Sequence, residues 1–333
     1  MRYDERDPES SNIEDRRGRR GGGFPFPGGG RGVRVPMGRG GLSFTTILII
    51  GAIMLLFGIN PLDLLRGGGG GGGGFPDIPQ MPRIDQGQGP QAGQRNPFEL
   101  PGSPASNEQP GQQASTDEMK RFVARVLADT ESFWGKEFQS HGMRYQEPRL
   151  VLFSGATQTA CGTGQSAMGP FYCPLDRKIY IDLSFFEELR RKFRAPGDFA
   201  QAYVVAHEVG HHVQMLLGIA EKVQSMKQRL DERRANALQV RMELQADCLA
   251  GVWAQRINQA TDGRRLEPGD IEEGLNAASA IGDDMIQRRM TGRVVPDAFT
   301  HGSSEQRVRW FRRGFDNGRM QVCDTFSVEG GQL

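Results

Sequence analysis

Eight consecutive glycines, Gly67 to Gly74, constrain this 333-residue chain more than any other feature of its sequence. Glycine loses more backbone freedom on folding than any other residue, so such a tract favours neither a helix nor a strand. Residues 1–115 also hold 26 of the 46 glycines and 13 of the 19 prolines. One packed domain from end to end is therefore excluded, and we expect a flexible Gly/Pro/Gln-rich linker over residues 60–115.

An uncharged apolar run of eighteen residues, 42–59, precedes the glycine tract. As a helix it would extend roughly 27 Å, enough to cross a bilayer, so membrane lipid is an expected partner. Nine arginines lie upstream and Arg66 alone follows closely, which predicts a single-pass protein with a cytoplasmic N-terminus and a periplasmic or otherwise extracytoplasmic C-terminal domain. A cleaved signal peptide is the alternative, but the residues around Gly58 do not form a small-x-small cleavage site.

Residues 1–41 are rich in arginine and glycine, and we expect a disordered cytoplasmic tail there. Such tracts can bind RNA through charge and stacking. Orientation in the membrane and contact with anionic lipid explain the same arginines more simply. The net charge of +1 gives no global field that attracts nucleic acid, so no nucleic-acid partner is expected.

Residues 116–333 have the composition of one compact domain. Helical spacing of apolar residues predicts a helix from an N-cap at Thr116 to about Phe138. A short strand is expected over Arg149–Phe153, and alternation predicts a second over Lys178–Phe185. Everything after this strand has helical patterns. We expect an α+β domain, predominantly helical with a small sheet.

The four cysteines all lie beyond the predicted span, and an even count on the oxidising side of a membrane fits two disulfides. Three pairings are possible. Short-range closure favours Cys161 with Cys173, which leaves Cys248 with Cys323. Buried free thiols are the alternative, and a cysteine-rich zinc site is disfavoured because the sequence has no C-x-x-C pair.

The hexapeptide His207-Glu208-Val209-Gly210-His211-His212 holds three of the five histidines. Its apolar neighbours indicate a helix, on which His207 and His211 share one face, so that two imidazoles can bind one zinc ion. Glu208 lies beside them, where a carboxylate can take a proton from a zinc-bound water without being a ligand. His212 is one position off that face and is expected to be structural.

A catalytic zinc needs a third protein ligand and one open position. Glu243 and Asp247 share a helical face within an apolar segment that we expect to be helical from about Leu230 to Ile257. Glu243 as ligand, with Asp247 accepting a hydrogen bond from a ligand histidine, would satisfy both charges. The alternative is a solvated acidic patch paired with Arg241 or another arginine. No third histidine follows at metzincin spacing, which favours a glutamate ligand.

Three further residues are candidates for contact with a substrate. His301 precedes a capping-box pattern formed by Ser303 and Gln306, and it can stabilise an oxyanion or simply lie at the surface. Tyr203 lies one turn before His207, where a phenol can donate to the oxyanion, although core packing is the simpler role. The strand that contains Tyr180 can present an edge to an extended peptide or lie in the core of the sheet.

These residues occur in sequence blocks that resemble the YpfJ-like bacterial neutral zinc metallopeptidases, a membrane-tethered group related to the gluzincins. The resemblance implies a zincin-like fold, zinc bound by His207, His211 and Glu243, and Glu208 as general base. It implies no particular substrate. The blocks are SSNIEDRRG, GPFYCPLDRKIYIDLSFF, AHEVGHHVQ, RMELQADCLAGVWA and HGSSEQRVRWFRRGF.

The favoured hypothesis is a membrane-anchored zinc metalloendopeptidase of the bacterial envelope, with one zinc ion per chain, acting on a peptide or protein substrate. Two imidazoles and a carboxylate suit zinc, although manganese and cobalt accept the same donors. A different class of function is a non-catalytic envelope binding module with a structural metal. The intact H-E-x-x-H pattern disfavours that module, because a structural site has no need of Glu208.

Overall fold

The computed structural model describes residues 1–18, 110–329, 331 and 333. These parts are α+β and predominantly helical with a small sheet, as the sequence predicts. In chain order the elements are β1 (Ile13–Asp15), α3 (Pro110–Ser140), β2 (Arg149–Phe153), β3 (Ala156–Thr159), β4 (Gly162–Gln165), η1 (Ser166–Met168), β5 (Phe171–Cys173), β6 (Lys178–Asp182), α4 (Ser184–Arg191), α5 (Asp198–Leu216), α6 (Ile219–Lys227), α7 (Glu232–Ala260), α8 (Asp270–Ala280), α9 (Asp283–Thr291), η2 (Pro296–Ala298), α10 (Ser304–Asn317) and η3 (Met320–Cys323).

A four-stranded mixed sheet has the order β1-β2-β6-β5, in which β5 alone is antiparallel to its neighbour. Successive side chains of a strand point to opposite faces. Leu150 and Leu152 of β2 therefore face the main core together with α3 and α5, while Val151 faces a smaller cluster on the other side. The strand predicted over Arg149–Phe153 is confirmed.

Strand β6 begins at Lys178 as expected but ends at Asp182, because the Asp182 carboxylate accepts the Ser184 backbone N–H at 3.0 Å as α4 begins. The strand pairs with β2 on one side and β5 on the other, so it has no free edge. Tyr180 is 1% exposed and stacks on Phe171. The prediction that Tyr180 binds substrate at a sheet edge is therefore wrong, and the edge on that side is β5.

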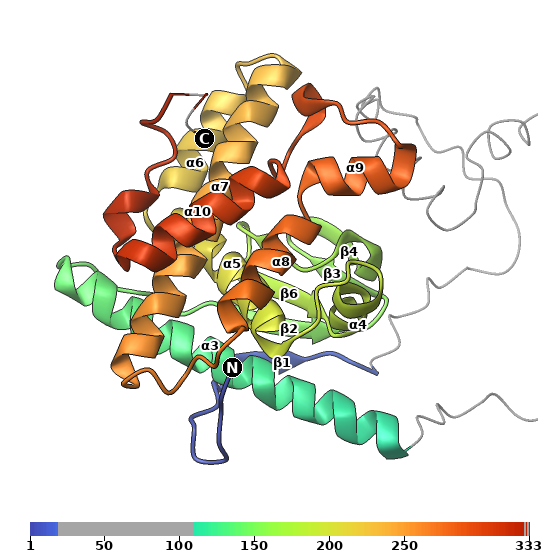
Figure 1. Ribbon diagram of the computed structural model, residues 1–333, viewed down its shortest axis with the longest axis vertical. Helices are drawn as coiled ribbons and strands as arrows, with labels where there is room; N and C mark the ends of the chain where they lie inside the picture. Colours follow the sequence, from blue (N-terminus) through green and yellow to red (C-terminus); the bar gives the residue numbers. More distant parts are fainter. Residues whose placement is uncertain (19–109, 330, 332) are drawn as a thin grey trace, which may run out of the picture. The chain divides into compact units, whose positions relative to one another are not determined.

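Helix α7 packs against both α5 and α10, and α7 and α10 lie above the sheet in Figure 1. A Cβ at Gly210 of α5 would lie 3.1 Å from the Cα of Ala246 in α7. A Cβ at Gly314 of α10 would overlap the carbonyl oxygen of Cys248 in α7. The absence of a side chain at these two glycines thus brings the H-E-x-x-H helix and α10 against the same acidic stretch of α7.

Helix α3 begins at Pro110, upstream of the predicted N-cap at Thr116, and continues to Ser140. Proline at the first helical position is favourable because its fixed φ suits the helix and its missing N–H costs nothing there. Thr116 consequently lies inside the helix, and the folded domain begins earlier than residue 116.

Residues 1–18 belong to the same compact unit as the C-terminal domain, in which β1 pairs with β2. In Figure 1 this segment, in blue, runs alongside α3 and the sheet. The expected disordered tail therefore does not begin at residue 1, because these residues have specific partners in the domain.

The predicted span at 42–59, the rest of the tail and residues 60–109 of the predicted linker lie outside the described residues. Among the helices described, none has the length and apolar character needed to cross a bilayer.

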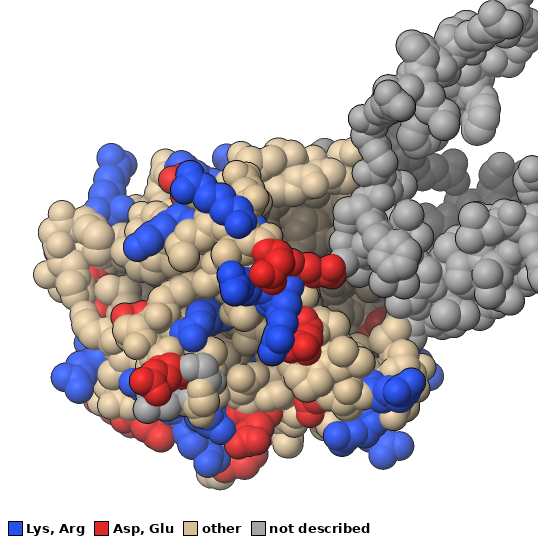
Figure 2. Space-filling view, turned by 90° about the horizontal axis from the view of Figure 1, so that it is seen from above, with Lys and Arg blue, Asp and Glu red and all other residues tan. Residues whose placement is uncertain are grey.

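Two disulfides join Cys161 to Cys173 and Cys248 to Cys323, which is the favoured pairing. The second connects α7 to η3. On the face shown in Figure 2, acidic and basic side chains of the described residues are interspersed, in keeping with the small net charge.

Candidate metal centre

Helices α5 and α7 bring His207, His211 and Glu243 together, with one donor atom of each within 4.8 Å of the others. The Nε2 atoms of His207 and His211 lie 3.2 and 3.4 Å from Oε2 of Glu243. Ligands at about 2.05 Å from a tetrahedral zinc ion would be about 3.3 Å apart. The three donors therefore fit one zinc ion, and the chain offers this set in a buried position.

Each metal-donor side chain also has a second polar atom, which does not face the metal position. Hydrogen bonds to that second atom fix the orientation of the side chain. The Gln214 side-chain amide donates to the Met242 carbonyl at 2.7 Å, so its oxygen faces Nδ1 of His211 at 2.9 Å. His211 therefore carries its proton on Nδ1 and presents the lone pair of Nε2 to the centre. Glu243 is held in the same manner, because its Oε1 accepts from Gln239 at 2.7 Å.

Asp247 organises the side of the centre behind His207. Its Oδ1 accepts from His207 Nδ1 at 2.7 Å and from the Tyr203 hydroxyl at 2.5 Å. Arg307 of α10 donates to both Asp247 oxygens at 2.9 Å. Burial raises the pKa of Asp247, but Arg307 and His207 outweigh it and hold that pKa below its ordinary value. Asp247 is thus an ionised acceptor that fixes the His207 tautomer.

The predicted contact of Tyr203 with a substrate is wrong. Tyr203 is fully buried, and its hydroxyl both donates to Asp247 and accepts from Arg307 at 3.1 Å. A phenol held on both sides in this way supports Asp247 and cannot reach an oxyanion.

Glu208 is 7% exposed and forms no hydrogen bond or ion pair with any residue that the structure describes. Burial is the main cause of its raised pKa, and the neighbouring histidines oppose that effect. A buried carboxylate that forms no hydrogen bond with a described residue, beside three metal donors, is suited to accept and donate a proton.

His212 faces away from the donors, as predicted. Its Nε2 donates to the Gln146 carbonyl, and its Nδ1 accepts from the Tyr172 hydroxyl at 3.0 Å. Burial lowers the pKa of His212 to about 4, which keeps the ring neutral. His212 thereby joins α5 to strand β5.

His301 lies in the loop before α10, whose predicted capping box of Ser303 and Gln306 is confirmed. The side chain is 52% exposed, and its Nδ1 lies 3.2 Å from Asp283. Burial lowers its pKa, but Asp283 and the charge of Glu243 raise it above the ordinary value. The imidazole is thus exposed, and the negative charges of Asp283 and Glu243 favour its protonated form.

Two residues of the centre, Arg307 and Gln214, were missed by the sequence reasoning. Arg307 shares the buried face of α10 with Trp310, Phe311 and Gly314, at helical spacings of three, four and seven. A charge on an apolar face is a signal of a buried partner. Gln214 lies three residues after His211 on the same helix, which is the spacing of side-chain neighbours.

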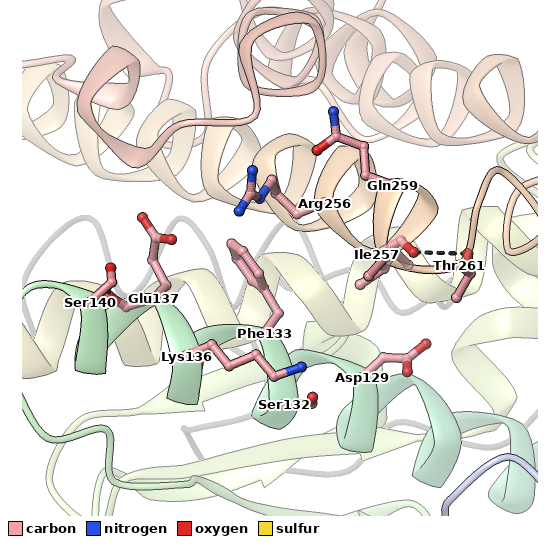
Figure 3. A pocket seen from close by; sticks show the side chains of 11 residues that line it. Asp129, Ser132, Phe133, Lys136, Glu137, Ser140, Arg256, Ile257, Gln259 and Thr261 are labelled. Atoms are coloured by element: carbon pink, nitrogen blue, oxygen red, sulfur yellow. Dashed lines mark hydrogen bonds between the residues drawn. The ribbon is translucent and has the colours of Figure 1, made fainter.

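A separate hollow of about 540 Å³ lies between α3 and the C-terminal part of α7. Figure 3 shows Phe133 and Lys136 of α3 opposite Arg256 of α7. None of the metal donors lines it, so it is distinct from the metal centre.

Two histidines and a glutamate around one point, with a free glutamate adjacent, define the metal-hydrolase class of site. Over residues 91–326 the chain matches the family described as "Putative neutral zinc metallopeptidase", and it belongs to this family. The resemblance expected from the sequence blocks is thereby confirmed, and membership implies zinc as the cofactor.

The chain is 47% identical over 320 residues to the uncharacterized protein YpfJ of Escherichia coli K12, covering 96% of each chain. It is also 47% identical over 192 residues to the uncharacterized protein Mb2605 of Mycobacterium bovis, covering 55% of this chain and 64% of that protein. No solved structure matches the chain.

Proposed function

We propose that the protein is a zinc-dependent metallopeptidase that holds one zinc ion per chain on His207, His211 and Glu243 and hydrolyses peptide bonds. One observation carries the proposal: the buried carboxylate of Glu208 has no partner among the described residues and lies directly beside three convergent donors. A purely structural metal site needs no such free carboxylate.

Zinc, when bound, supplies Lewis acidity and lowers the pKa of water. Glu208 accepts the proton of the attacking water and then delivers it to the leaving amine, which its raised pKa favours. Asp247 and Gln214 keep both ligand imidazoles in the tautomer that presents Nε2. The edge strand β5, which contacts α5, offers backbone groups to an extended peptide.

The decisive variant is Glu208→Gln, which preserves shape but removes the base. We expect a fall in kcat of about 10²–10⁴-fold with unchanged zinc content, because Glu208 is not a ligand. Cleavage of a mixed peptide library by the full-length protein, with metal analysis of the same samples, measures both quantities. The exposed Glu221→Gln is the matched control and should behave as the parent.

Cleavage by the parent should also stop on chelation and return with zinc. Undiminished cleavage by Glu208→Gln would show that the assigned base is wrong. Complete absence of chelator-sensitive cleavage by the parent would favour a non-catalytic binding module with a structural metal.

His301 is assigned to stabilise the oxyanion, because its exposed imidazole lies beside Asp283, and the charges of Asp283 and Glu243 favour the protonated ring. His301→Gln is expected to lower kcat by about 100–1000-fold without loss of zinc. A parallel measurement of KM separates this role from substrate binding, which would raise KM and leave kcat unchanged.

A further inference from the structure

Residues 1–18, here called the N-terminal segment, are bound by the metal-binding domain along most of their length. Hydrogen bonds from the backbone place the segment beside α3, β2 and the loop before α8. They run from Arg2 N to Arg265 O at 2.9 Å, Ser10 N to Ala124 O at 3.0 Å, Leu150 N to Asn12 O at 2.9 Å and Arg16 N to Leu152 O at 2.8 Å.

Arg265 of the domain has most of its partners in the N-terminal segment. Its guanidinium donates two hydrogen bonds to Asp7, at 2.9 and 3.0 Å, and one to the Arg2 carbonyl at 2.7 Å. It also lies 4.2 Å above the ring of Tyr3. The domain itself supplies Asp129, at 3.2 Å. Arg265 is 8% exposed, so the segment provides the main countercharge of a buried cation.

Two acidic groups of the domain, the buried Asp270 and the partly buried Glu131, also have partners in the segment. Asp270 is 4% exposed and accepts from the amino group of Met1 at 2.9 Å. Glu131 accepts from the Ser10 hydroxyl and the Asn12 amide at 2.8 and 2.9 Å. Segment and domain are thus complementary in charge, hydrogen bonding and β-pairing.

Three arginines of the segment have local roles that differ from orienting a membrane span. Arg2 pairs with Glu267, Arg16 with Glu14, and Arg17 with Asp15. These arginines were part of the positive charge that predicted a cytoplasmic N-terminus. Their ion pairs weaken the prediction of a cytoplasmic N-terminus, because the three arginines contribute to the fold of the segment.

We propose that the domain has a groove whose ligand is this chain's own N-terminal segment, so that residues 1–18 and 110–333 lie in the same compartment. A single membrane crossing between the two parts would separate them and leave the groove without its ligand. This proposal differs from the expected topology, in which the N-terminus and the domain lie on opposite sides of a membrane.

Bound β1 also covers the outer edge of β2, which would otherwise offer unpaired backbone groups to other chains. The opposite edge of the sheet is β5, next to the H-E-x-x-H helix. The segment therefore leaves the edge beside the metal centre as the place for an added strand.

The first experiment places cysteines in the full-length protein and treats intact cells with a membrane-impermeant maleimide. Arg6→Cys reports on the segment, and Met226→Cys, on exposed α6, reports on the domain. Equal labelling of both sites, or equal protection of both until lysis, is the expected result. Labelling of one site in intact cells and of the other after lysis alone would overturn the proposal.

The second experiment tests docking in the same full-length protein. Glu9 and Arg125 form an ion pair at 3.1 Å, so Glu9→Cys with Arg125→Cys should be joined within one chain by a short bis-maleimide. Glu9→Cys with Met226→Cys is the matched control and should not react, since α6 lies far from the segment in Figure 1. A crosslinked dimer would overturn the assignment to the chain's own segment, and the absence of any crosslink would overturn the groove.

A third measurement needs no cysteine. Asp7→Asn should lower the midpoint of thermal unfolding by roughly 5 °C, because it weakens the main countercharge of Arg265. Glu5→Gln removes the same charge from an exposed position and should leave the midpoint unchanged. Equal midpoints for the two variants would contradict the groove.

Discussion

The metal centre and the groove for the N-terminal segment both depend on charge pairs, but they differ in how far those charges are removed from water. The side chains of Asp247 and Arg307 are 0% and 2% exposed, whereas those of Glu14 and Lys178 are 29% and 24% exposed. A fully buried charge that loses its partner cannot be rehydrated, while a partly exposed one can. The metal centre therefore depends on a few irreplaceable contacts, whereas the segment combines two buried charge sites, at the Met1 amino group and Arg265, with many partly exposed contacts of small individual value.

The largest effect should come from Asp247→Ala, which leaves the buried Arg307 guanidinium and the Tyr203 hydroxyl without their acceptor. We expect a loss of about 3–5 kcal/mol in the free energy of unfolding, measured by urea denaturation. Asp316→Ala, an exposed position on α10, should change that free energy by less than about 0.5 kcal/mol. Similar losses in the two variants would show that the buried Asp247 contributes no more to stability than an exposed carboxylate.

Arg307→Met should have the next largest effect. It leaves Asp247 with His207 and Tyr203 as donors, so the His207 ring is held less firmly and zinc affinity is expected to fall about 10–100-fold. Competition with a fluorescent chelator measures that affinity. Arg309→Met is the control, because Arg309 lies on the same helix, is 45% exposed and pairs with Glu305. An unchanged zinc affinity in Arg307→Met would remove Arg307 from the support of the centre.

The smallest effect should be a weaker docking of the N-terminal segment at acidic pH. Hydrogen bonds from Arg16 and Lys178 lower the pKa of Glu14 from its ordinary 4.5 to about 2, and Tyr180 is the other titratable group that faces it. A depressed carboxyl pKa stabilises docking above about pH 4.5, and this stabilisation is lost as the pH falls towards 2. Amide-exchange protection of residues 13–16 should fall about tenfold over that range, after discounting for solvent exposure.

Glu14→Gln should lose part of this pH dependence while the protection of α7 amides stays the same. A pH profile identical to that of the parent would mean that Glu14 does not contribute to docking. Asp15, whose pKa Arg17 and Lys120 also lower, accounts for the dependence that remains.

The parts of the metal centre that the sequence predicts are those set by a single helix. His207 and His211 are four residues apart, as are Glu243 and Asp247, and helical geometry alone places each pair on one face. The strand at Arg149–Phe153, the capping box at Ser303 and the Cys161–Cys173 disulfide follow from similarly local patterns.

The errors arise where a local pattern has more than one tertiary outcome. Alternation identifies the strand of Tyr180 but not its neighbours, and pairing on both sides placed it inside the sheet. A polar, arginine-rich N-terminus has the composition of a disordered tail, yet residues 1–18 are ordered by partners more than a hundred positions away.

The sequence by itself determined which donor residues share a helical face, because helix and strand periods fix this whatever surrounds them. The tertiary structure alone decided which charges meet: Arg307 reaches Asp247 because Gly314 allows α10 against α7, and Asp7 reaches Arg265 across the whole chain. Such pairings depend on how closely backbones approach, and close approach is a property of packed surfaces that no single segment specifies.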